Sequence, residues 1–110
     1  MAEDLVGEVV LPPDTPVGTA AMVRIEVRDT SLLDVPSTVV AAEALRGVPI
    51  GPGGRIPFRL QADLPGGRTL TLRVHVSMDG SEATRPGDLL TTESVSVPDR
   101  LPQVPVQVVR

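Results

Sequence analysis

Hydrophobic and polar residues alternate along this chain in short runs that stop at proline or glycine. The clearest run covers residues 69–77, where apolar side chains occupy the even positions and Thr71, Arg73 and His75 lie between them. Successive side chains of a strand point to opposite faces, so this period of two predicts a strand with one buried and one wet face. No long stretch has the 3.6-residue spacing of an amphipathic helix.

Seven segments of this kind predict strands. They cover residues 5–11, 22–27, 38–45, 56–62, 69–77, a part of 89–97, and 104–109. The third segment also suits a short helix, because VVAAEAL is rich in helix formers. We therefore expect one all-β domain over residues 1–110: a single antiparallel β-sandwich of about seven strands, with Greek-key, prealbumin-like or immunoglobulin-like architecture.

Glycine and proline mark the turns and the edges of this predicted sheet. The turn sequences are GVPIGPGG (47–54), LPGG (64–67) and MDGS (78–81), and SEATRPGD (81–88) adds a longer polar excursion. Pro57 and Pro105 stand at outward positions inside strands. Since proline cannot donate to a hydrogen-bond ladder, both strands are predicted to lie at sheet edges.

Composition removes several classes of function. The 110 residues include no Cys, no Trp and no Tyr, and carry a net charge of −4. Thiolate chemistry is thereby excluded, and nucleic-acid binding is disfavoured because phosphate backbones are repelled and stacking platforms are lacking. All ten basic residues are Arg, with no Lys or Asn, which indicates a GC-rich genome.

The cellular location is left open by the chain. No apolar run of 18 residues exists, so we expect no direct membrane insertion. The start, MAEDLVGEVV, lacks the basic and apolar regions of a secretory signal. The protein is then either cytoplasmic or exported with a leader that precedes Met1, and the oligomeric state is open.

The densest polar stretch is VRDTSLLDVPST, residues 27–38. Its acidic residues Asp29 and Asp34 are candidate ligands for a hard cation such as calcium, although their spacing matches no EF-hand loop. The favoured interpretation is a structural motif in which Asp29 and Ser31 bond to nearby backbone amides and Asp34 and Pro36 set the following turn.

Groups for catalysis are few. His75, the one histidine, is a candidate general base or metal ligand, but its alternation with valines predicts an exposed sheet residue. The carboxylates at turns would need a fixed cleft to act as a glycosidase pair. The glycine clusters at 51–54 and 65–67 lack the Lys-Ser/Thr of a phosphate loop. We expect no enzyme, no catalytic residue and no cofactor.

Several short motifs resemble those of one known protein family and suggest a function. The matching features are Pro-Pro-Asp at 12–14, Asp-Thr-Ser at 29–31, Asp-x-Pro-Ser at 34–37, Ile-Pro-Phe at 56–58 and Asp-Gly at 79–80. In this order, over most of residues 8–80, the chain resembles the type III secretion lipoprotein chaperone family, also called secretin pilotins. The resemblance implies a small bacterial β-sandwich that binds an outer-membrane secretin subunit and helps its targeting and assembly. It implies no catalytic residues, and the acylated Cys that anchors secretory members is not in this sequence.

The main hypothesis is therefore a non-catalytic interaction domain, chaperone-like or pilotin-like, which binds a protein or peptide partner along a sheet edge or face. The alternatives are a cation- or small-ligand-binding sandwich that uses the 29–34 loop, and a domain with no role in secretion.

Overall fold

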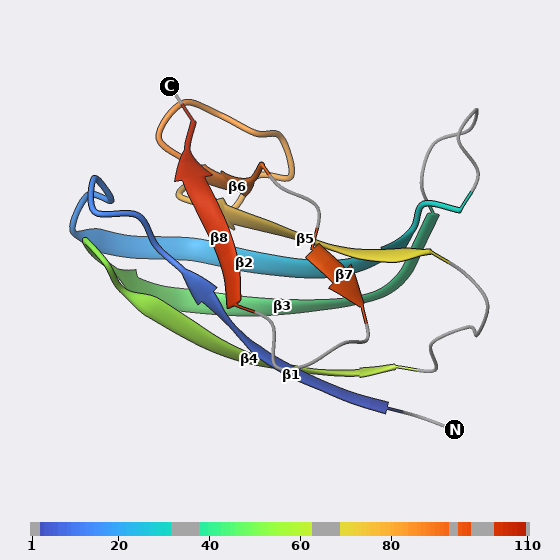
Figure 1. Ribbon diagram of the computed structural model, residues 1–110. Coiled ribbons are helices and arrows are strands. Elements are labelled where there is room, and N and C mark those ends of the chain that lie inside the picture. Colours follow the sequence, from blue (N-terminus) through green and yellow to red (C-terminus); the bar gives the residue numbers. More distant parts are fainter. Residues whose placement is uncertain (1–2, 32–37, 63–68, 93–94, 98–102, 110) are drawn as a thin grey trace.

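The computed structural model describes residues 3–31, 38–62, 69–92, 95–97 and 103–109, which form eight strands (Figure 1). The strands are β1 (Glu3–Val10), β2 (Gly18–Asp29), β3 (Thr38–Ile50), β4 (Arg55–Ala62), β5 (Leu70–Ser77), β6 (Leu89–Thr91), β7 (Val95–Val97) and β8 (Gln103–Val108). The all-β prediction is confirmed. In the described part of the chain, no helix is long and apolar enough to span a membrane.

All strands belong to one sheet in the order β3-β2-β5-β6-β8-β1-β4, and β7 pairs separately with β5. Strand β8 joins the two halves, because its residues 106–108 pair with β6 and its residues 103–105 pair with β1. The sheet thereby curls around its core, and its end strands β3 and β4 make some contacts without a ladder between them, beside a hollow lined by Glu43 of β3 and by Arg59 and Gln61 of β4. The result is a nearly closed, barrel-like sheet.

The predicted antiparallel arrangement is wrong at one pairing. Strands β1 and β8 run parallel, whereas the other pairs are antiparallel, so the sheet is mixed. A parallel pair needs a long connection, which a hairpin pattern in the sequence cannot reveal. The finer assignment, a β-sandwich with Greek-key, prealbumin-like or immunoglobulin-like architecture, is not confirmed by this topology.

The core lies between the half of the sheet made by β2, β3 and β5 and the half made by β1, β4 and β8 (Figure 1). Every second residue of β5, from Leu70 to Val76, is buried in one cluster with side chains of β1, β2, β4, β6 and β8. The members of this cluster are Leu5, Val9, Leu11, Ala20, Val23, Ile25, Val27, Ile50, Ile56, Phe58, Leu60, Leu70, Leu72, Val74, Val76, Leu89, Val104 and Val106. The apolar even positions of residues 69–77, which alternation predicts to be buried, are therefore buried.

Strand β3 settles the ambiguous third segment. It pairs with β2 from Gly18↔Ile50 to Asp29↔Thr38, so the helical alternative is wrong. Pairing along a whole neighbouring strand overrides the helix propensity of its alanines. The strand also runs further than predicted, which shortens the turn at 47–54 to residues 51–54.

Two further details differ from expectation. The segment 89–97 supplies two short strands, β6 and β7, which pair with different ends of β5. Pro57 lies exposed on the end strand β4, as predicted. Pro105 does not lie on an edge, since β8 has two neighbours; it is tolerated because it ends the β1 ladder and precedes the β6 ladder.

Leu89 tests how much the short strand β6 contributes to stability. Its side chain is fully buried, whereas the adjacent Leu90 is half-buried. We expect Leu89→Ala to lower the free energy of unfolding by about 3 kcal/mol, through lost burial and a residual cavity. Leu90→Ala is the matched control, with an expected loss below about 1.5 kcal/mol. Urea unfolding measures both, and equal losses would contradict the assigned orientation of β6.

Candidate functional site

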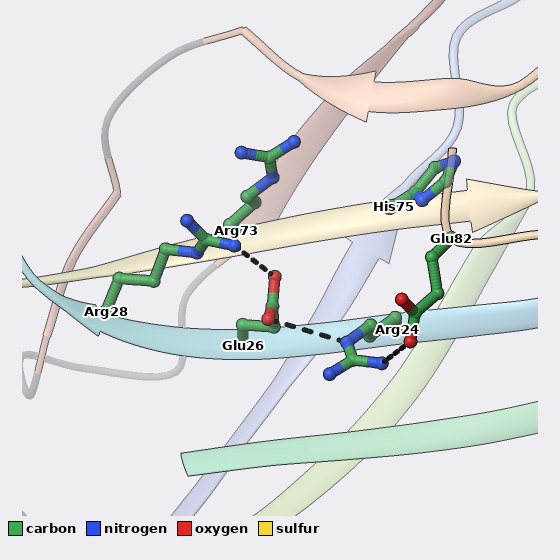
Figure 2. A pocket seen from close by; sticks show the side chains of 6 residues that line it. All are labelled: Arg24, Glu26, Arg28, Arg73, His75 and Glu82. Carbon is green, nitrogen blue, oxygen red and sulfur yellow. Dashed lines mark hydrogen bonds and ion pairs between the residues drawn. The ribbon is translucent and has the colours of Figure 1, made fainter. Parts of the chain in front are cut away.

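The strands β2 and β5 place a row of charged side chains on the face opposite the core. In their antiparallel register Arg24 stands opposite His75, and Glu26 stands opposite Arg73. Together with Arg28 and with Glu82 of the loop 78–88, these residues line a hollow of about 240 Å³ (Figure 2). Three arginines and two glutamates make this the main charged feature of the face.

Glu26 is the centre of the cluster. Its side chain is only 8% exposed, and its two carboxylate oxygens contact different arginines. Oε1 accepts a hydrogen bond from Arg28 Nη2 at 3.1 Å, and Oε2 lies 3.4 Å from Arg24 Nε (Figure 2). A buried carboxylate is tolerated when it is paired in this way. Alternation along β2 puts Glu26 on the face opposite the core, where the arginines on both sides of it pair with its carboxylate.

Arg73 and Glu82 complete the hollow in different ways. The Arg73 side chain makes no hydrogen bond or ion pair with any residue that the structure describes. Glu82 is 83% exposed, and its Oε1 lies 3.4 Å from Arg24 Nη1, which makes a long and solvated contact. The hollow thus holds one arginine without a described partner and one weakly paired arginine.

His75 is buried, so the prediction of an exposed sheet residue is wrong. The loop 78–88 covers it, because Nε2 of His75 lies 2.9 Å from Oδ2 of Asp88, whose side chain is 2% exposed. The same carboxylate accepts backbone hydrogen bonds from Met78 and Arg85, each at 3.0 Å. Asp88 therefore fastens both ends of the loop that carries Glu82.

The surroundings of Asp88 act on its pKa in opposite directions. Burial raises the pKa, while the Met78 N–H, the His75 ring and the Arg85 N–H lower it. The hydrogen bonds outweigh burial, and the net result is a pKa below the ordinary value.

The Asp29 stretch makes local contacts with the backbone. Oδ1 of Asp29 accepts a hydrogen bond from the Ser31 N–H at 2.9 Å. The Ser31 hydroxyl oxygen accepts one from the Thr69 N–H at 2.7 Å, which ties this stretch to the start of β5. Asp34 and Pro36 lie outside the described residues, so their part in the motif stays a prediction.

Among the described residues, few side chains are placed to bind a metal ion or to take part in catalysis. No group of three His, Asp or Glu side chains placed to hold a metal ion occurs among the described residues. The buried Ser77 hydroxyl accepts from the Gly80 N–H and donates to the Ser81 carbonyl, so it acts within the loop. The absence of catalytic and cofactor residues stays a prediction.

Sequence reasoning missed Glu26 and Asp88 as buried charges. A signal for the first is present: Arg-Ile-Glu-Val-Arg at 24–28 puts three charges on one strand face. No comparable signal marks Asp88, since its contacts depend on how the loop 78–88 folds back over β5.

Comparison with solved structures gives a likeness in fold. The structure of an alternative pilotin from the type II secretion system of Vibrio cholerae matches with a TM-score of 0.69 and 19% identity, over 99% of this chain and 96% of that one. No protein-family model and no curated protein matches the chain. The fold is thus pilotin-like, and the likeness does not single out type III secretion.

Asp88 should make stability depend on pH. The pKa of Asp88 is lower in the folded state than in the unfolded chain. Between about pH 5 and 3 the unfolded chain therefore binds more protons than the folded one, and the free energy of unfolding falls as the pH drops. Asp88→Asn should lose about 2 kcal/mol of unfolding free energy at pH 7 and show a flatter pH dependence between about pH 5 and 3. Chemical unfolding across this range measures both, and parallel pH curves for the two proteins would contradict the assignment.

The Glu26 carboxylate should stabilise the fold by balancing the positive charge of the arginines around it. Glu26→Gln keeps the shape but leaves adjacent positive charges uncompensated, so we expect a loss of about 1–2 kcal/mol, moderated because the arginines are partly exposed. The matched control Glu82→Gln should change stability by less than about 0.5 kcal/mol. Urea unfolding at low and high salt measures both. If Glu26→Gln lowers the free energy of unfolding by no more than Glu82→Gln does, this prediction is wrong.

Proposed function

We propose that this protein is a non-catalytic domain that binds a protein partner in the manner of a pilotin, with a secretin subunit as the expected partner. The observation that carries the proposal is the fold match with a pilotin over nearly the full length of both chains. The motif resemblance in the sequence favours the same kind of protein independently of the fold. The proposal leaves open which type of secretion system is served.

The open edge of the sheet supplies a way to bind. Strand β3 is 13 residues long and, among the described strands, has β2 as its one hydrogen-bonded neighbour. An extended partner segment can add to such an edge through backbone hydrogen bonds. The other end strand, β4, carries exposed Pro57 and is the poorer acceptor. We therefore place the partner segment along β3.

Catalysis is not part of the proposal. The best candidate pair, His75 and Asp88, is buried and holds a loop in place. For the alternative of a cation site in the 29–34 loop, one oxygen of Asp29 already accepts a backbone hydrogen bond. Both observations favour the binding domain over the alternatives.

A direct binding measurement tests the proposal. The probes are purified secretin subunits of the type II and type III secretion systems of the source bacterium, titrated by isothermal calorimetry. We expect a dissociation constant below about 100 μM for one of them. If none of them binds at about that concentration, the pilotin-like function is wrong.

Two proline variants test the β3 edge. Along an edge strand, successive residues direct their N–H groups alternately to the neighbour and to the open side. Of Ala42→Pro and Glu43→Pro, one should break the β2 ladder and unfold the protein, and the other should keep the fold and lose partner binding by more than about tenfold. Circular dichroism identifies the folded variant, and unchanged binding by that variant would exclude the β3 edge.

A further inference from the structure

We infer that the hollow on the outer face of β2 and β5 is a carboxylate-binding site, which takes acidic side chains from an extended segment of the protein partner. Arg73 and Arg24 are the principal ligands. This inference deepens the proposed function and rests on it for the identity of the partner, while the site itself can be tested alone.

The arginines have the spacing of a strand. Arg24 and Arg28 lie four residues apart on β2, with Glu26 midway between them, and Arg73 stands directly across the ladder from Glu26, so the three arginines occur at every second level along the strands. Alternate side chains on one strand face repeat every 7 Å or so. An extended segment with acidic residues at every second position repeats at the same interval and can meet the row in register. Arginine suits carboxylates in particular, because its planar fork can donate two parallel hydrogen bonds.

Glu26 and Glu82 do not pair with all three arginines of the hollow. One oxygen of Glu26 contacts Arg24 and the other contacts Arg28, which leaves the Arg73 side chain with no hydrogen bond or ion pair in the described structure. Glu82 meets Arg24 at 3.4 Å from a mostly exposed position on the loop. Exposed pairs of this kind contribute little, so a partner carboxylate can displace Glu82 at small cost. Glu82 occupies the place that the ligand would take.

Small side chains leave a path from the β3 edge to the arginines. Ala44 stands opposite Arg24 and Ala42 stands opposite Glu26 in the β2–β3 register. Both alanines are exposed, and with Arg24 and Glu43 they line a second, shallow hollow next to the first. A long acidic side chain from a strand added at β3 can extend over them toward Arg24. The site thus adjoins the edge that the proposed function uses.

The chemistry favours single carboxylates over phosphate chains. Three arginines and two glutamates line the hollow, so its positive charge is small, and the whole chain has a net charge of −4. Nucleic acids and anionic membranes carry dense negative charge, which such a protein repels. The described lining also has no Trp, Tyr or Phe side chain on which a base could stack.

Peptide titration tests the site. The probe is an acetylated and amidated peptide, Thr-Glu-Val-Glu-Val-Glu-Thr, and its control has glutamine in place of each glutamate. Followed by ¹H–¹⁵N NMR at low salt, the acidic peptide should shift the Arg73 and Arg24 side-chain Nε–Hε signals and the amides of β2, β3 and β5. The effect should weaken at 0.5 M NaCl, where charges are screened within about 5 Å. No shift at about 5 mM peptide, or equal shifts from the glutamine peptide, would overturn the inference.

Two controls separate the possible ligands and sites. Inorganic phosphate that shifts the same signals at tenfold lower concentration than the peptide would overturn the choice of carboxylate. Arg73→Gln and Arg24→Gln should each weaken peptide binding about fivefold, the size expected for a partly exposed ion pair. The matched variant Arg55→Gln, which changes an exposed arginine on β4, should leave binding unchanged. Equal losses from all three variants would mean a general charge effect and no site.

The secretin measurement keeps this inference distinct from the proposed function. If the secretin subunit binds and Arg73→Gln and Arg24→Gln bind it equally well, the carboxylate site is wrong and the function stands. If the peptide binds at the arginines and no secretin binds, the site stands and the pilotin-like function is wrong.

Discussion

The pairing of β2 with β5 is the interaction on which the rest of the structure depends. Its register, from Val23↔Val76 to Arg28↔Thr71, aligns apolar residues of both strands on one face and charged residues on the other. The apolar face forms the centre of the core, and the opposite face forms the hollow. A slip of one residue would reverse both faces, so core and site are fixed by the same ladder.

Charge burial constrains the outer face as strongly as apolar burial constrains the inner one. Glu26 can remain nearly inaccessible because Arg24 and Arg28 flank it at alternate positions of the same strand. The buried carboxylate of Asp88 is stabilised by different groups, since it accepts hydrogen bonds from two backbone N–H groups and contacts the His75 ring. In both cases a buried carboxylate organises its neighbours, and in the second it fastens the loop that carries Glu82 over the face.

The sequence predicted the strands well and their arrangement poorly. Alternation located the inward residues of β5, because a period of two is a local property of the chain. The partial exposure of β3 along its length hid its periodicity, and its alanines suggested a helix. The parallel pairing of β1 and β8 joins residues 95 positions apart, and no local pattern encodes it. His75 was assigned to solvent for the same reason: the carboxylate that buries it arrives from a loop 13 residues further along the chain.

The two end strands of the sheet differ in how well they can accept an added strand from a partner. Strand β4 carries Pro57 within its length, and proline both removes a donor and discourages a further strand. Strand β3 carries Pro49 only beside its last residue, which leaves most of its backbone able to pair. The charged hollow lies on the side of β2 that faces away from the core and adjoins β3 through exposed alanines. Because backbone pairing alone does not distinguish one sequence from another, a partner strand on β3 needs side-chain contacts for selectivity, and the arginines of the hollow are groups that can provide them.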